Sequence, residues 1–166
     1  MNIIGLDLSL TDSGVFYSYN NTNYQLNIKS KEKGVTRLID IKTQLWQELF
    51  TKINFDLIVI EGYGFSTFKG HSLGELGGVI KVLLKTKFPK TPIILVPPTV
   101  LKKFITGKGN ADKSQMLLQI YKKYDKEFNN HNIADAYALF EFGKMCLKDK
   151  KTKEEVYLVS KTAISK

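Results

Sequence analysis

The chain has almost no cysteine, and it has no apolar run long enough to cross a membrane. Its single cysteine, Cys146, excludes an internal disulfide and is typical of a reducing compartment. No stretch approaches the roughly 20 apolar residues that a membrane-spanning helix needs. The Met-Asn-Ile-Ile start lacks the basic region of a signal peptide. These absences predict a cytoplasmic protein with no membrane partner.

Arginine is also scarce, although the chain is strongly basic. The net charge is +9, and Arg37 is the only arginine among the 25 basic residues. A lysine ammonium is a compact point charge that suits phosphate, and it lacks the planar fork that reads base edges. The surplus therefore indicates binding to a nucleic-acid backbone. The alternative is a surface that is charged only for solubility.

The pattern of apolar residues predicts one domain of strands and helices, for which 166 residues are sufficient. Turn residues separate the first three strands, one such group lying at residues 11–14. Strands separated by helices are usually parallel neighbours. The order therefore predicts an α/β fold with a five-stranded mixed sheet flanked by helices on both faces. The predicted strands are residues 2–9, 15–19, 24–28, 57–61 and 93–96, and the predicted helical segments are residues 35–52, 73–84, 100–105, 113–124 and 130–147.

Three carboxylates lie where apolar segments end or pause. Asp7 ends the first strand, Glu61 ends the fourth, and Asp135 lies in the first turns of the last helix. An ionised carboxylate among buried neighbours costs several kcal/mol unless a cation or hydrogen-bond donors compensate it. Parallel first and fourth strands place Asp7 and Glu61 at the same carboxyl edge of the sheet. Small residues beside Asp135 allow its helix to approach that edge.

These three side chains predict a divalent metal site. Ligand sets made only of oxygen favour Mg²⁺ or Mn²⁺ over zinc. Two such ions about 4 Å apart can activate water and stabilise a leaving oxygen in phosphodiester hydrolysis. The alternatives are local roles, in which Asp7 satisfies a turn, Glu61 caps a loop and Asp135 favours a helix N-terminus.

Four segments, in order and spacing over residues 1–145, together carry a family resemblance. They are Gly5-Leu6-Asp7-Leu8-Ser9-Leu10-Thr11 with Gly14, then Ile60-Glu61, Ala111-Asp112-Lys113-Ser114-Gln115 and Ala134-Asp135-Ala136. In these segments the chain resembles the RuvC-type Holliday junction resolvases of the RNase H-like superfamily, and its compactness suggests a phage member. The resemblance implies a homodimer that cuts four-way DNA junctions by symmetrical nicks. It also implies that Asp7, Glu61 and Asp135 are catalytic metal ligands for Mg²⁺ or Mn²⁺, with two ions in each site.

The chain departs from the family at one position. Members of the family carry a second acidic residue or a histidine three positions before the last aspartate, where this chain has Asn132. Asn132 offers only a neutral carbonyl oxygen, whereas His131 lies one helical turn from Asp135. Either residue is a candidate additional metal ligand. The alternative is that both simply begin the helix.

An aromatic segment and a group of lysines are the candidate DNA-binding residues. Tyr63 and Phe65 follow Glu61 in a glycine-flanked segment, where aromatic rings stack on unpaired bases. The family inserts an aromatic side chain near the junction centre at this point, and Phe65 is the preferred candidate. The alternative is that these rings pack under their own segment. The candidate phosphate-binding lysines are Lys102, Lys103, Lys108 and Lys113.

Two of these lysines, Lys102 and Lys113, match the positions of the family's phosphate-contacting lysines. Lys113 is also a candidate catalytic residue that stabilises charge on the scissile phosphate. Some of the four are expected to be merely solvated. Binding through lysines should weaken as salt is added.

The predicted helix at residues 73–84 contains three glycines, each of which costs up to about 1 kcal/mol against alanine. Close approach of a second helix explains such a cost. The family dimerises through this helix, so the resemblance implies a homodimer contact here. The alternative is packing within one subunit.

Residues 1–147 are expected to form the nuclease domain, and residues 148–166 a basic, partly disordered tail. Two other functions fit parts of the sequence. One is a junction-binding architectural protein without catalysis. The other is an actin-like phosphotransferase, because residues 7–14 resemble the first phosphate loop of that fold. Such kinases need two domains around the nucleotide, and this chain supplies one.

Overall fold

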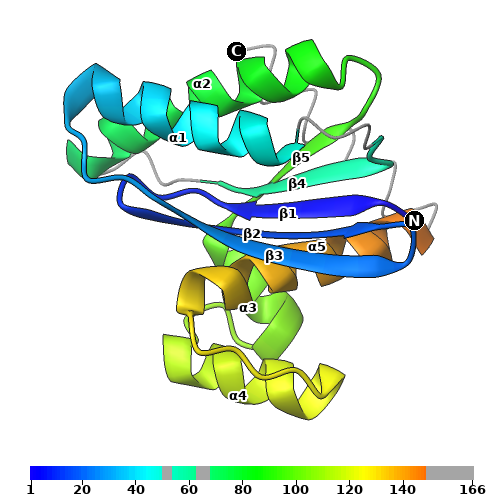
Figure 1. The fold of residues 1–166 in the computed structure, drawn as a ribbon. Coiled ribbons are helices and arrows are strands. Elements are labelled where there is room, and N and C mark those ends of the chain that lie inside the picture. The colour runs from blue at the N-terminus through cyan, green and yellow to red at the C-terminus, as the bar shows by residue number, and fades with distance from the viewer. Residues whose placement is uncertain (50–53, 63–67, 149–166) are drawn as a thin grey trace.

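The computed structural model describes residues 1–49, 54–62 and 68–148, with side chains from residue 71 onward in the last range. One mixed sheet of five strands lies between two layers of helices (Figure 1). The strand order is β3-β2-β1-β4-β5, with β1, β4 and β5 parallel and β2 antiparallel to both of its neighbours. The elements are β1 (Ile3–Asp7), β2 (Asp12–Tyr19), β3 (Thr22–Lys29), α1 (Gly34–Leu49), β4 (Leu57–Glu61), α2 (Phe68–Lys87), β5 (Ile93–Val96), α3 (Pro98–Thr106), α4 (Lys113–Tyr124) and α5 (His131–Lys148).

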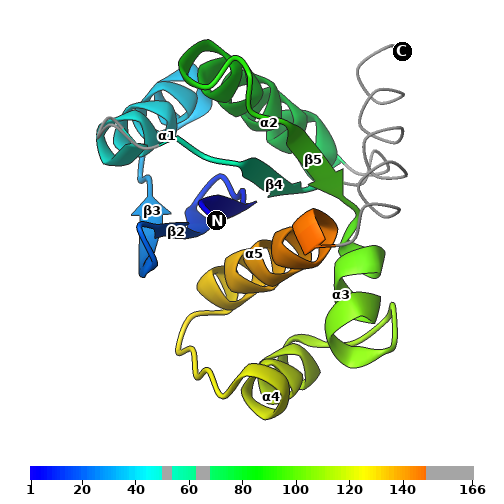
Figure 2. The same ribbon diagram turned by 90° about the vertical axis from the view of Figure 1, so that its right-hand side faces the viewer.

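Alternation along the strands divides the core between the two faces of the sheet. Ile4 and Leu6 of β1 point into the cluster beneath α1 and α2. Ile3, from the other face of the same strand, joins the cluster around α5, with α3 and α4 packed beyond it (Figure 2). The predicted fold class is therefore confirmed. Because both faces are covered, the central strands read as continuous apolar runs.

Local chemistry fixes where several helices begin and end. Asn130 caps α5, as its Oδ1 accepts hydrogen bonds from the backbone nitrogens of Asn132 and Ile133. Pro98 begins α3, where its missing N–H costs nothing. Gly107 ends that helix in the left-handed region with a φ of 79°.

Several predicted boundaries differ from the structure, which has β1 at residues 3–7, β3 at 22–29 and α3 at 98–106. The group at residues 11–14 is not a turn, because Asp12 already pairs with Lys29 at the start of β2. The predicted end of α1 at residue 52 lies outside the described residues, which reach Leu49 in this helix. The α2 helix begins at Phe68, five residues before the predicted start. None of the helices in the described ranges is both long and apolar enough to span a bilayer.

Candidate active site

Asp7 and Glu61 end two neighbouring parallel strands, as the sequence predicts. Leu6 of β1 pairs with Ile60 of β4, so the next residue of each strand emerges at the same edge of the sheet. The two side chains share a hydrogen bond, which raises the pKa of Asp7 and lowers the pKa of Glu61. Asp7 is 8% exposed, whereas Glu61 and Asp135 are half-buried.

Asp135 reaches the same edge because α5 lies directly on β1 and β2. A β-carbon added at Gly5 would lie 2.2 Å from the carbonyl oxygen of Ala136, and one added at Gly14 would lie 2.0 Å from that of Asn132. Side chains at these two glycines would push the helix away from the sheet. The charge of Asp135 acts on both Asp7 and Glu61. The structure therefore brings the three predicted carboxylates together.

The electrostatics of this group are those of like charges buried together. Burial, and after it the charges of Glu61 and Asp135, together raise the pKa of Asp7 to about 9. Burial, then the charge of Asp135, raises the pKa of Glu61 to about 7. Burial also raises the pKa of Asp135. A site of this kind favours protons or a cation over three bare carboxylates.

Two of the predicted lysines offset this negative charge. The Lys113 ammonium lowers the pKa values of all three carboxyl groups, and Lys102 lowers those of Glu61 and Asp135. Lys113 is the first residue of α4. Its backbone is held by a capping box, in which the Asp112 side chain accepts from the Gln115 nitrogen at 2.8 Å and the Gln115 side chain accepts from the Asp112 nitrogen at 3.1 Å.

The other two lysines lie farther from this chemistry. Lys103 is exposed on α3, and Lys108 is exposed between α3 and α4. Neither contributes to the pKa shifts of the three carboxyl groups. Contact of these two lysines with a phosphate backbone stays a prediction.

The two candidate additional ligands behave differently. The charge of His131 lowers the pKa of Asp135, so this exposed imidazole lies near the site. The side-chain nitrogen of Asn132 donates a hydrogen bond of 2.8 Å to the carbonyl oxygen of Asp12. Its amide is therefore directed toward β2.

The donor set suits a hard divalent cation, because the buried Asp7 and the half-buried Glu61 and Asp135 offer only oxygen. As they stand, no three His, Cys, Asp or Glu side chains of the described ranges are grouped closely enough to hold a metal ion. The carboxylates thus interact through charge and one shared hydrogen bond without forming a complete ligand shell. Tyr63 and Phe65, the predicted stacking residues, lie outside the described residues.

The sequence reasoning missed the role of Gly5 and Gly14 in positioning the site. The turn predicted at Gly14 is wrong, because Gly14 lies opposite Asp7 in the β1–β2 ladder and packs against the first turn of α5. The available signal was the run of small residues Ala134, Ala136 and Ala138, which predicts a helix lying close to glycines on a sheet.

Known proteins support the family resemblance at the level of sequence. The chain is 30% identical over 155 residues to the crossover junction endodeoxyribonuclease RuvC of Chlamydia caviae, covering 82% of this chain and 88% of that protein. The RuvC of Chlamydia felis matches with the same identity and coverage. No protein-family model matches the chain. The suggestion of a phage member stays a prediction.

Solved structures share the fold at lower sequence identity. Thermus thermophilus RuvC in complex with a Holliday junction substrate superposes with a TM-score of 0.68 at 18% identity, covering 84% of this chain and 90% of that one. The resolvase of Fowlpox virus, bound to Holliday junction DNA, has a TM-score of 0.50 at 17% identity, covering 84% and 95%. The fold is RNase H-like, and by its identity to the two chlamydial proteins the chain belongs to the RuvC family of crossover junction endodeoxyribonucleases.

Proposed function

We propose that this chain is a metal-dependent, structure-selective endonuclease that resolves four-way DNA junctions by paired symmetrical nicks. The observation that carries the proposal is the meeting of Asp7, Glu61 and Asp135 at one edge of the sheet, in a chain of the RuvC family. The relatives named above are crossover junction endodeoxyribonucleases, and two structures of the same fold contain Holliday junction DNA.

The three carboxylates are the proposed ligands of Mg²⁺ or Mn²⁺, with two ions in each site. The raised pKa values support this assignment, because a buried group of like charges is relieved when a cation binds. When bound, the ions supply Lewis-acid stabilisation of the charge that develops at the scissile phosphate. Lys113 adds a fixed positive charge beside the same carboxylates.

The basic residues are proposed to hold the DNA backbone. Lys102 and Lys113 lie at the carboxylates, and Lys103 and Lys108 extend the positive charge along α3 and the segment after it. Lysine contacts to phosphate position the DNA without reading its sequence. Tyr63 and Phe65 remain the proposed stacking residues at the junction centre.

Homodimerisation through α2 is the proposed assembly. The α1 and α2 helices border a groove of about 710 Å³ lined by Trp46, Gly78 and Val82, among others. Gly78 costs up to about 1 kcal/mol within its helix, yet in the described part of the chain a β-carbon there would meet no atom within 4 Å outside its own helical backbone. Val82 is 68% exposed beside it. A second copy packed on this helix would explain both the glycine at position 78 and the exposed side chain of Val82. A two-fold dimer also presents two sites to a two-fold junction.

The test is cleavage of a synthetic mobile junction with Mg²⁺ or Mn²⁺, with the products mapped on denaturing gels. We expect nicks at symmetrical positions in two opposite strands. Asp7→Asn should bind the junction without cutting it, because it removes a proposed ligand and no lysine. Asp125→Asn is the matched control, since Asp125 is exposed and adopts a left-handed conformation that asparagine also accepts.

Two outcomes would overturn the proposal. Retarded but uncut DNA with the unaltered chain and both metals would support the non-catalytic, junction-binding alternative. Cutting by Asp7→Asn at the unaltered rate would remove the carboxylates from the mechanism. The boundary between a nuclease domain and a basic tail stays a prediction, since residues 149–166 lie outside the described residues. The cytoplasmic location also stays a prediction.

A further inference from the structure

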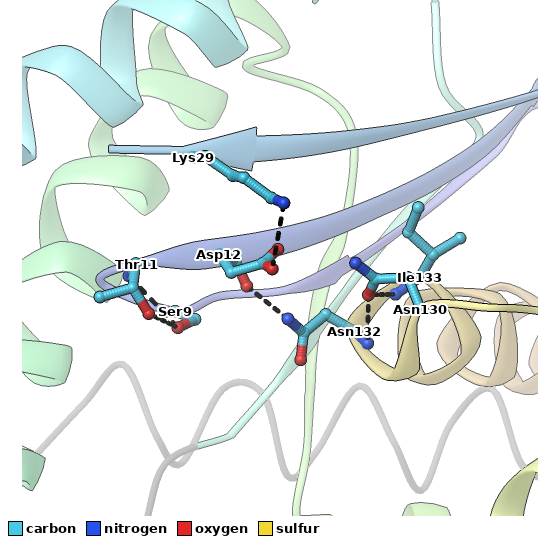
Figure 3. A network of polar contacts seen from close by, with 7 residues as sticks. All are labelled: Ser9, Thr11, Asp12, Lys29, Asn130, Asn132 and Ile133. Atoms are coloured by element: carbon cyan, nitrogen blue, oxygen red, sulfur yellow. Dashed lines mark hydrogen bonds and ion pairs between the residues drawn. The ribbon is translucent and has the colours of Figure 1, made fainter. Parts of the chain in front are cut away.

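The first turn of α5 is joined to β2 by a side chain that the RuvC resemblance marks as a candidate metal ligand. Asn132 donates from Nδ2 to the carbonyl oxygen of Asp12 at 2.8 Å, across 120 positions of sequence (Figure 3). In the same turn, Asn130 accepts from the backbone nitrogens of Asn132 at 2.8 Å and of Ile133 at 3.2 Å. One asparagine thus caps the helix, and the next attaches it to the sheet.

The backbone is packed tightly at this point. A β-carbon at Gly14 would lie 2.0 Å from the Asn132 carbonyl oxygen and 2.8 Å from the Ile133 nitrogen. Gly14 is two residues after Asp12 on β2 and pairs with Asp7 on β1. The attachment of α5 is therefore next to the strand pair that carries the first catalytic carboxylate. Asp135 follows Asn132 by three residues, so both lie on neighbouring positions of one helical face.

Only a donor can make this contact. A backbone carbonyl oxygen accepts hydrogen bonds, so the NH₂ end of the Asn132 amide must face it. An ionised carboxylate at position 132 would place acceptor against acceptor and lose the bond. The side chain of Asp12 is not used: in the described part of the chain its Oδ1 is buried without a hydrogen-bond partner, and its Oδ2 lies 3.9 Å from Lys29 Nζ.

We propose that Asn132 is a positioning residue, which sets Asp135 against Asp7 and Glu61 by bonding α5 to the β2 backbone, and that it is not a metal ligand. In this chain the position that carries an acid or a histidine in the resembled family serves as a link between helix and sheet. The catalytic group then consists of three carboxylates. The inference rests on the proposed function for its kinetic test alone.

The first test uses hydrogen exchange in the metal-free protein. Asn132→Ala should speed exchange of the backbone amides at 133–136 by about tenfold, which is the change expected when the net stabilisation of one hydrogen bond is lost. Asn132→Asp should do the same. Alanine is a better helix former than asparagine, and aspartate is favoured at a helix N-terminus, so neither substitution weakens the helix itself. Asp12→Asn should keep the protection, because only the backbone of Asp12 takes part.

The second test measures Mn²⁺ binding without DNA and the cutting rate at saturating metal and junction. Asn132→Ala should lower kcat about 10- to 100-fold through misplacement of Asp135, with metal-free junction affinity unchanged. Ser18→Ala is the control for stability alone. Its hydroxyl donates to the Met1 carbonyl oxygen at 2.8 Å near the far end of the β1–β2 pair, so this variant should lose stability and keep kcat.

The two roles of Asn132 predict opposite results. If Asn132 were a ligand, Asn132→Ala would leave metal-free exchange unchanged and weaken Mn²⁺ binding, whereas Asn132→Asp would tighten binding and keep the cutting rate. That pattern would overturn the inference. Equal loss of kcat in Asn132→Ala and Ser18→Ala would overturn it too, since the effect would then be general destabilisation. An unaltered chain that fails to cut would refute the proposed function and leave the exchange test intact.

Discussion

A β-carbon at Gly5 of β1 would lie 2.2 Å from the carbonyl oxygen of Ala136 in α5 and 2.8 Å from the Phe140 nitrogen. The contact is backbone against backbone, so no side-chain rotation relieves it. Asp7 follows Gly5 by two residues in β1, and Asp135 directly precedes Ala136 in α5. The same close packing that builds the core therefore sets the distance between these two carboxylates.

Gly5→Ala should lower the free energy of unfolding by about 3 kcal/mol, because an added methyl must move either the helix or the strand. Denaturant unfolding measures the change. Gly62→Ala is the control, since its added methyl would meet its nearest neighbour, the Val96 carbonyl oxygen, at an ordinary 3.4 Å. A Gly5→Ala variant as stable as Gly62→Ala would contradict the packing described here.

The metal-free protein should lose stability as the pH rises. Asp7 has its pKa raised to about 9 in the folded chain, whereas its ordinary value is 3.8. Between these values the folded state holds a proton that the unfolded state has released, so stability falls with increasing pH across this window. Glu61, raised to about 7, acts in the same direction.

The expected result is a Tm in a chelating buffer that is lower at pH 8 than at pH 5. Asp7→Asn should raise the Tm at pH 8 by roughly 5 °C, because asparagine is neutral in the buried site without taking up a proton on folding. It should also flatten the dependence on pH. Added Mn²⁺ should restore much of the stability that the unaltered chain loses at pH 8 and little of that of Asp7→Asn. A metal-free Tm that rises with pH would show that burial does not strain these carboxylates.

The sequence predicts this site better than it predicts how the site is held. Asp7 and Glu61 follow from strand ends, and Asn130 follows from helix-capping chemistry, because both signals are local. The bond from Asn132 to Asp12 depends on where α5 lands on the sheet, which no local pattern records. Gly14 shows the same limit: a glycine after turn-forming residues reads as a turn, yet long-range pairing with β3 makes it part of a strand.

Lys113 should affect the chemical step more than DNA binding. Its charge reaches all three carboxylates, and it begins a helix whose capping box fixes its backbone. Removal of a group that stabilises developing charge typically costs about 100-fold or more in kcat. Lys113→Gln should therefore cut about 100-fold more slowly under single-turnover conditions, with a modest change in junction affinity.

Lys103→Gln is the matched comparison, because Lys103 is an exposed lysine that does not act on the carboxylates. It should weaken binding and reduce the dependence of affinity on salt, while leaving the single-turnover rate of bound junction unchanged. Equal losses of rate in the two variants would mean that Lys113 only anchors the backbone.

Substitution of Val82 tests the proposed homodimer contact through α2. This side chain lines the groove between α1 and α2 and is 68% exposed in the single subunit, so a second copy seated there would bury it. Val82→Glu would place an unpaired carboxylate in that contact, at a cost of several kcal/mol, and should convert a dimer to a monomer in analytical ultracentrifugation. Val35→Glu is the control, because residue 35 is 71% exposed, lies outside the groove, and as glutamate would carry a favourable charge at the N-terminus of α1.

The monomeric variant should keep its Tm within a few degrees of the unaltered chain, if the interface is not required for folding. It should also lose the pairing of nicks, since one subunit offers one site. A Val82→Glu variant that stays dimeric and still cuts both strands together would exclude α2 as the interface.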